Sequence, residues 1–97
     1  MKDVKAKLQW YKIVNGETKY PKDGYSTVAW FEKDKDKWPD EAWSLVLNNI
    51  KISVKENEII ANVRFLVPEK APKYLLNVGS VFKLYEGRQC VAEGQIL

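Results

Sequence analysis

The chain has 97 residues, enough for one hydrophobic core, because a chain of this length buries only about two thirds of its unfolded surface. Its apolar fraction of 45% is typical of a globular protein, and no apolar run approaches the ~20 residues that a membrane-spanning helix requires. The 16 basic and 13 acidic residues leave a net charge of +3. This charge is too small to indicate which kind of partner the chain binds.

These properties predict one domain over residues 1–97 with no membrane partner. The first residues are polar and lack the apolar stretch of a secretory signal, so we expect a cytoplasmic protein. Cys90 is the only cysteine and has no internal partner for a disulfide. We expect it to be reduced and to serve packing.

In chain order, strict alternation of apolar and polar residues predicts a first strand over residues 4–14, which ends at the turn dipeptide Asn15-Gly16. A second turn signal spans residues 21–24 and contains Pro21 and Gly24. Residues 25–32 are rich in β-formers and predict the next strand. Its odd-numbered residues share one face, so Trp30 lies on the other.

Residues 33–37 alternate in charge and predict an exposed loop between strands. Residues 42–47 fit either a strand or a short helix capped by Asp40, and we favour the strand. Alternation then predicts strands over residues 50–54 and 59–67, the second with a buried face that includes Val67.

Near the carboxyl terminus, residues 74–76 form an apolar cluster that predicts a single helical turn closing one end of the core. Extended chain restarts at Gly79. Residues 81–85 and 89–96 flank a turn in which Gly87 takes the left-handed conformation, which predicts a bulged β-hairpin. Six or seven short strands without an amphipathic helix favour a barrel or a sandwich, and periodicity does not choose between them.

Three carboxyl-terminal segments, residues 63–68, 79–87 and 91–97, resemble the end of the third domain of elongation factor Tu. Gly24-Tyr25 followed by Phe31 is similar to another strand of that family. The resemblance implies an all-β fold, a small closed antiparallel barrel, with Gly79, Gly87 and Gly94 as structural turn residues. Family members contact transfer RNA and an exchange factor through this domain, but Ser26-Thr27-Val28 replaces the family's Arg-Pro-Gln, so the activity does not carry over.

The sequence offers little for catalysis. A phosphate-binding Gly-x-x-x-x-Gly-Lys-Ser/Thr loop is absent, and so is histidine, the commonest general base and metal ligand. The acidic residues Asp34, Asp36, Asp40 and Glu41 are interleaved with lysines and lack the glycine of a calcium loop, so we read them as solvated. We therefore expect no catalytic residue, no cofactor and no metal; an enzyme subunit is the least favoured function.

Nine tryptophan and tyrosine residues are more than a core of this size encloses, so some must lie at the surface. Surface aromatic residues are enriched at binding hot spots, although single exposed rings also occur without function. Trp30 and Trp38 flank the lysine-rich segment and are the expected exposed pair. The candidate binding residues are Tyr25, Trp30, Trp38, Lys33 and Lys35.

These residues predict a stand-alone binding module with a protein partner. The alternative is RNA binding, which requires lysines and aromatic rings to share one face; DNA binding is not expected. Lys5, Lys7 and Lys12 form a basic face with Lys51 and Lys55 if their strands are neighbours. The competing interpretation is that outward lysines prevent edge strands from pairing with other chains.

Overall fold

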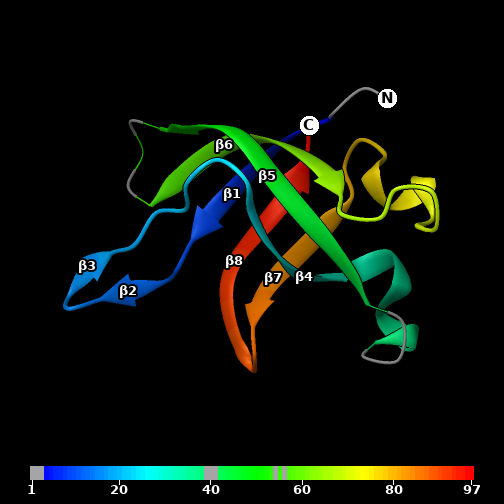
Figure 1. Cartoon of the computed structure of the whole chain (residues 1–97), viewed down its shortest axis with the longest axis horizontal. Coiled ribbons are helices and arrows are strands. Elements are labelled where there is room, and N and C mark those ends of the chain that lie inside the picture. Colours follow the sequence, from blue (N-terminus) through cyan, green and yellow to red (C-terminus); the bar gives the residue numbers. More distant parts are fainter. Residues whose placement is uncertain (1–3, 39–41, 54, 56) are drawn as a thin grey trace.

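The computed structural model describes residues 4–38, 42–53, 55 and 57–97. Six strands form a closed antiparallel barrel in the order β1-β6-β5-β4-β7-β8 (Figure 1). The expected all-β barrel is therefore confirmed. Its strands are β1 (Val4–Trp10), β4 (Tyr25–Phe31), β5 (Trp43–Ile52), β6 (Glu58–Phe65), β7 (Val81–Glu86) and β8 (Gln89–Ile96).

The barrel closes where β1 pairs with β8, and Leu8 lies opposite Gly94 in that register. Alternate residues of β1 and β6 are buried, as a pleated strand requires, whereas β5 and β8 each bury consecutive residues next to a bulge. The interior is filled mainly by aliphatic and phenylalanine side chains, with one tryptophan. Fully buried large residues include Leu8, Trp10, Leu45, Leu47, Ile59, Leu75, Phe82 and Leu84.

The predicted first strand is too long, because the barrel strand β1 ends at Trp10. The chain then leaves the barrel as a two-stranded arm made of β2 (Ile13–Val14) and β3 (Glu17–Thr18). Ile13 is 62% exposed, so this part has no core to face. The turn at Asn15-Gly16 is confirmed, since both residues have positive φ, as a tight hairpin requires.

The strand reading of residues 42–47 is confirmed over the part that belongs to β5, whereas Asp40 lies outside the described residues. The expected separate strand at residues 50–54 is wrong: β5 runs unbroken to Ile52. A β-bulge between Asn48 and Lys51 joins the two segments, and Asn49 has a φ of 51° there. One extra residue in the bulge lets both halves pair with β6.

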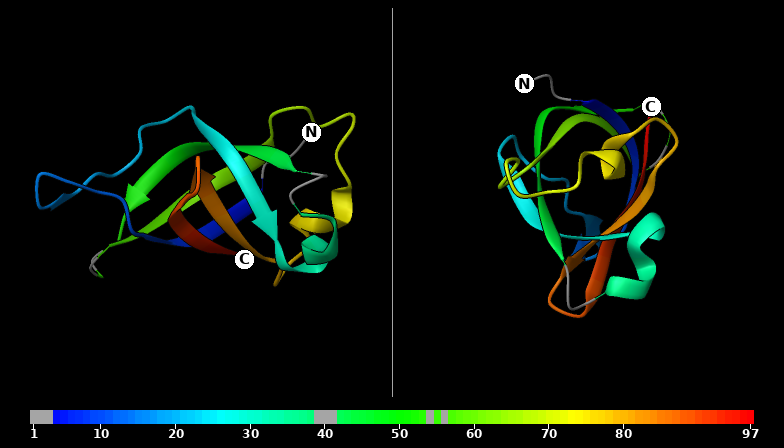
Figure 2. Two further views of the ribbon diagram at one scale, coloured as in Figure 1. Left: turned by 90° about the horizontal axis from the view of Figure 1, so that it is seen from below. Right: turned by 90° about the vertical axis from the view of Figure 1, so that its right-hand side faces the viewer.

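Residues 33–37 lie between β4 and β5 and are mostly exposed, as expected, but they form the 3₁₀ helix η1 (Glu32–Lys37) and not a loop. Asp34 has non-helical backbone angles, with a φ of −118° and a ψ of 26°, so η1 consists of two short turns joined by a kink. The helical turn at residues 74–76 is confirmed as η2 (Lys73–Leu76), whose Leu75 is fully buried. In Figures 1 and 2, η1 and η2 lie at one end of the barrel and the arm projects from the other.

Neither helix in the described part of the chain has the length and apolar character needed to cross a membrane. The strand predicted to reach Val67 ends at Phe65, and Val67 is 40% exposed because Leu66 to Pro68 turn out of the barrel wall. The last hairpin is confirmed: β7 and β8 pair up to the turn at Gly87-Arg88.

Gly79 and Gly87 have φ values of 88° and 62°, so their assignment as turn residues is confirmed. Gly94 is not a turn residue. It lies within β8, and a Cβ atom added there would stand 2.4 Å from the ring of Phe82. A residue without a side chain is needed at this position because an aromatic ring packs directly on the strand.

Candidate functional site

The outer face of β4 and β7 carries a row of large side chains that we call the aromatic strip: Val28, Trp30, Trp38 and Tyr85. All four are partly exposed. Val28 and Trp30 are outward residues of β4, and Val28 lies opposite Tyr85 of β7. Two predicted binding residues, Trp30 and Trp38, therefore lie on the same side of the barrel.

Trp38 reaches the strip because η1 turns the chain back toward β7. The Trp38 N–H donates to the Lys35 carbonyl over 3.3 Å and ends the helix. The Trp38 ring then packs on Tyr85, with 5.5 Å between ring centroids and 34° between planes. Such a tilted ring contact helps to hold both rings in place.

Trp30 is held by a cation rather than by a second ring. Lys83, its cross-strand partner, places Nζ 5.2 Å from the Trp30 ring centroid. The same ammonium lies 3.9 Å from a carboxylate oxygen of Glu93. The strip is therefore flanked by a lysine that is already engaged on two sides.

The lysines predicted to join this site do not face it together. The Lys33 Nζ donates to the Tyr74 carbonyl of η2 over 3.2 Å, so it ties the two short helices to each other. Lys35 is exposed on η1. Asp34 was expected to be solvated, but it is partly buried and accepts a hydrogen bond from the Tyr74 hydroxyl, so that expectation is wrong for this residue. Asp40 and Glu41 lie outside the described residues.

Tyr25, the fifth predicted residue, lies at the other end of β4, about 16 Å along the strand from Trp30. It lines a hollow of about 310 Å³ at the base of the arm. We call this hollow the lysine pocket. Its lining residues are Trp10, Lys12, Lys19, Tyr20, Pro21, Lys22 and Tyr25.

A hydrogen-bonded chain of three groups borders the lysine pocket. The Tyr25 hydroxyl donates to Glu86, whose other carboxylate oxygen lies 2.8 Å from Lys12 Nζ. The hydrogen bonds from Lys12 and then from Tyr25 lower the pKa of Glu86 below its usual value. Burial, with the neighbouring Glu86 carboxylate, raises the pKa of Tyr25. At neutral pH Glu86 is therefore an ionised carboxylate and Tyr25 a neutral phenol.

A separate basic face spans three strands. β6 lies between β1 and β5, so the strands carrying Lys7 and Lys51 are not neighbours. Both lysines nevertheless lie opposite Ile60, about 10 Å apart across two strand spacings. A hollow of about 320 Å³ beside them is lined by Lys5, Lys51 and Asn62 among others, and aromatic rings are missing from its described lining.

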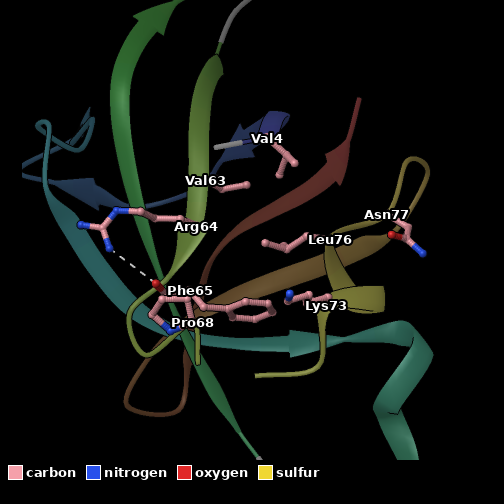
Figure 3. Close-up of a pocket in the computed structure, with 8 residues that line it drawn as sticks. All are labelled: Val4, Val63, Arg64, Phe65, Pro68, Lys73, Leu76 and Asn77. Carbon is pink, nitrogen blue, oxygen red and sulfur yellow. Dashed lines mark hydrogen bonds between the residues drawn. The ribbon is translucent and has the colours of Figure 1, made fainter. Parts of the chain in front are cut away.

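A third hollow, of about 240 Å³, opens at the η2 end (Figure 3). Its lining is mostly apolar and includes Val4, Phe65 and Leu76. The Arg64 guanidinium points away from Leu76, and its Nη1 donates to the Phe65 carbonyl over 3.5 Å (Figure 3). Lys73 is the remaining cation of the lining, so this hollow offers less to fix a charged ligand than the lysine pocket does.

Cys90 is partly buried, and its Sγ lies 3.4 Å from the Ala92 carbonyl. Within the described residues, no group of three or more carboxylate or thiol side chains is arranged to hold a metal ion.

Sequence reasoning missed two groupings. Tyr85 was one of nine aromatic residues, but its pairing with Trp38 depends on β7 lying beside β4. The pairing of Lys12 with Lys19 could have been predicted from the sequence. Both residues are equally far from the Asn15-Gly16 turn, so they lie opposite each other across the arm. Comparison with protein-family models, with curated proteins and with solved structures gave no match to this chain.

Proposed function

We propose that this chain is a protein-binding module that uses the aromatic strip and has no catalytic activity of its own. One observation carries the proposal: Trp38 packs on Tyr85 and extends the outward face of β4 and β7, where Trp30 also lies. The kinship with the third domain of elongation factor Tu stays a prediction from sequence.

The composition of the strip favours a protein partner. Tryptophan and tyrosine dominate binding hot spots, because each covers a large area with few rotatable bonds. Here the rings are also held before binding, Trp30 by Lys83 and Trp38 by Tyr85. These side chains therefore lose little conformational freedom when a partner binds, which lowers the entropic cost of association.

The charged residues around the aromatic strip indicate the chemical character of the partner surface. η1 contributes three acidic and three basic residues, so its side of the rim has no net charge. Lys83 is already paired with Glu93. The expected partner surface has apolar side chains at its centre and mixed polar groups around them, because a strongly acidic or basic surface gains nothing from this rim.

The test compares affinity capture by the wild type with capture by Trp30→Ala and Trp38→Ala. Tyr11→Ala is the matched control, since it removes a 44% exposed ring at the base of the arm. The protein retained by the wild type is then purified and its affinity measured by calorimetry. We expect each tryptophan variant to bind it at least tenfold more weakly, which is the effect of a hot-spot residue. Equal affinities for wild type and both variants, with unchanged circular dichroism, would overturn the proposal.

RNA binding is the second candidate function, and one observation favours it. Lys12, Lys19 and Lys22 share the lysine pocket with Tyr20 and Tyr25, so cations and rings meet on one surface. Titration with labelled transfer RNA at two salt concentrations tests it, because affinity through phosphate contacts falls steeply as salt rises. Absence of binding at low salt would exclude this function.

A further inference from the structure

We propose that the lysine pocket binds a nucleoside phosphate, with the base against the tyrosine rings and the phosphate between the ammonium groups of Lys19 and Lys22. The inference does not depend on the aromatic strip. It names the ligand chemistry for the second candidate function, whether the nucleotide is free or part of a single strand.

The backbone of the lysine pocket is fixed by hydrogen bonds on each side. The Lys19 N–H donates to the Lys12 carbonyl over 2.8 Å and closes the base of the arm. The Trp10 indole N–H donates to the Lys19 carbonyl over 2.6 Å. On the other side, the Tyr25 N–H donates to the Lys22 carbonyl over 2.9 Å. Three lysines from separate segments are therefore held around one hollow.

Two of the three ammonium groups are available to an anion. Lys12 is engaged by Glu86 at 2.8 Å. Lys19 and Lys22 are exposed, and neither has a carboxylate partner among the described residues. Asp23 is next to Lys22 in the chain, but its Oδ1 accepts the Ile50 N–H on β5. The excess positive charge of the pocket is thus carried by Lys19 and Lys22.

The aromatic rings of the lysine pocket favour a nucleotide over inorganic phosphate. Trp10 is 1% exposed and meets Tyr25 edge to face, with 5.4 Å between centroids. Tyr20 and Tyr25 are partly exposed and line the hollow beside it. Aromatic side chains beside cations bind nucleobases by stacking, and they tolerate every base. A volume of about 310 Å³ is at the lower end for ligand sites and suits a single nucleotide.

Nuclear magnetic resonance of the ¹⁵N-labelled full chain tests the site directly. The chain has four tryptophans, so its indole N–H region gives at most four signals, assigned by Trp→Phe variants. AMP, inorganic phosphate and a short single-stranded oligonucleotide are added separately. We expect AMP or the oligonucleotide to shift the Trp10 indole signal, which reports on the bond to Lys19, while the Trp30 and Trp38 signals stay in place.

Variants that change one charge measure the contribution of each group. Lys19→Gln and Lys22→Gln should each weaken binding about fivefold, as expected for one unit charge near a phosphate in water. Glu86→Gln should strengthen binding, because it removes the carboxylate that competes for Lys12. Lys7→Gln is the matched control, since it removes the same charge from the basic face that spans β1, β6 and β5.

Two outcomes support the inference: AMP binding sensitive to Lys19 and Lys22 identifies a free nucleotide, and oligonucleotide binding with the same sensitivity identifies a nucleotide within a strand. Inorganic phosphate binding as tightly as AMP would overturn it, because the rings then contribute nothing. So would a failure of both nucleotide probes to bind. Oligonucleotide binding that is lost in Lys7→Gln but kept in Lys19→Gln and Lys22→Gln would also overturn it, while RNA binding itself would stand.

Discussion

A methyl group at residue 94 would collide with the ring of Phe82, which packs on β8 inside the barrel. The Cβ atom of an alanine there would stand 2.4 Å from Phe82 Cζ and 2.8 and 2.9 Å from its two Cε atoms. Phe82 is fully buried, and its centroid is 5.8 Å from that of Phe31, so the ring has little room to retreat. We expect Gly94→Ala to destabilise the barrel by forcing the ring or the strand to move.

The size of this effect follows from the number of contacts. Overpacking a core by a methyl group costs about 1–3 kcal/mol, and a clash with three ring atoms at once places Gly94→Ala near the upper value. A domain of this length has a free energy of unfolding of roughly 5–15 kcal/mol. A loss of about 3 kcal/mol lowers Tm by roughly 12–24 °C, at 4–8 °C for each kcal/mol.

A double-mutant cycle of Gly94→Ala and Phe82→Leu tests whether the clash with the Phe82 ring causes the destabilisation. The free energies of unfolding are measured in urea and by heating. Phe82→Leu removes the Cε and Cζ atoms, so in that background Gly94→Ala should cost less than about 1 kcal/mol, which is a coupling of about 2 kcal/mol. Gly87→Ala is the control: nothing lies within 4 Å of its added Cβ, and its φ of 62° carries a cost that Phe82 does not influence. Equal costs of Gly94→Ala in both backgrounds would refute the close-packing explanation.

Three further changes have defined outcomes. Lys12 and Tyr25 keep the pKa of Glu86 below its usual value. The ionised Glu86 therefore stabilises the fold fully above about pH 5, and this stabilisation is lost as the pH falls through the lowered pKa. The free energy of unfolding of the wild type should exceed that of Glu86→Gln by less at pH 3 than at pH 7 in urea titrations. Asn49 has a φ of 51°, so Asn49→Val should cost about 1–2 kcal/mol in thermal unfolding and Asn49→Gly almost nothing; equal costs would contradict the bulge geometry. Leu75→Ala empties a buried site and should cost about 2–4 kcal/mol, with hydrogen exchange at η2 rising most; unchanged exchange there would show that Leu75 does not anchor the helix.

Local patterns made much of the barrel predictable. Alternation placed Ala6, Leu8 and Trp10 on the inner face of β1, and burial agrees. The turns at Asn15-Gly16 and Gly87 were readable because only a few residues accept positive φ. The break expected inside β5 was wrong, since a single left-handed residue can bend a strand without ending it.

The candidate sites were less predictable because they depend on contacts between distant segments. Trp38 and Tyr85 are 47 positions apart and meet only because β4 pairs with β7 and η1 folds back over them. Gly94 resembled a turn residue, whereas its real constraint is a ring from the neighbouring strand. Neither the contact of Trp38 with Tyr85 nor that of Gly94 with Phe82 can be predicted from the order of residues in the sequence.

The central functional claim is that Trp30 and Trp38 form the surface that binds a protein. The most direct measurement adds the purified captured partner to the ¹⁵N-labelled chain and follows the tryptophan indole signals. We expect the Trp30 and Trp38 signals to shift or broaden, while the signal of Trp10, which is 1% exposed and lines the lysine pocket, stays in place. A shift of the Trp10 signal with Trp30 and Trp38 unchanged would contradict it.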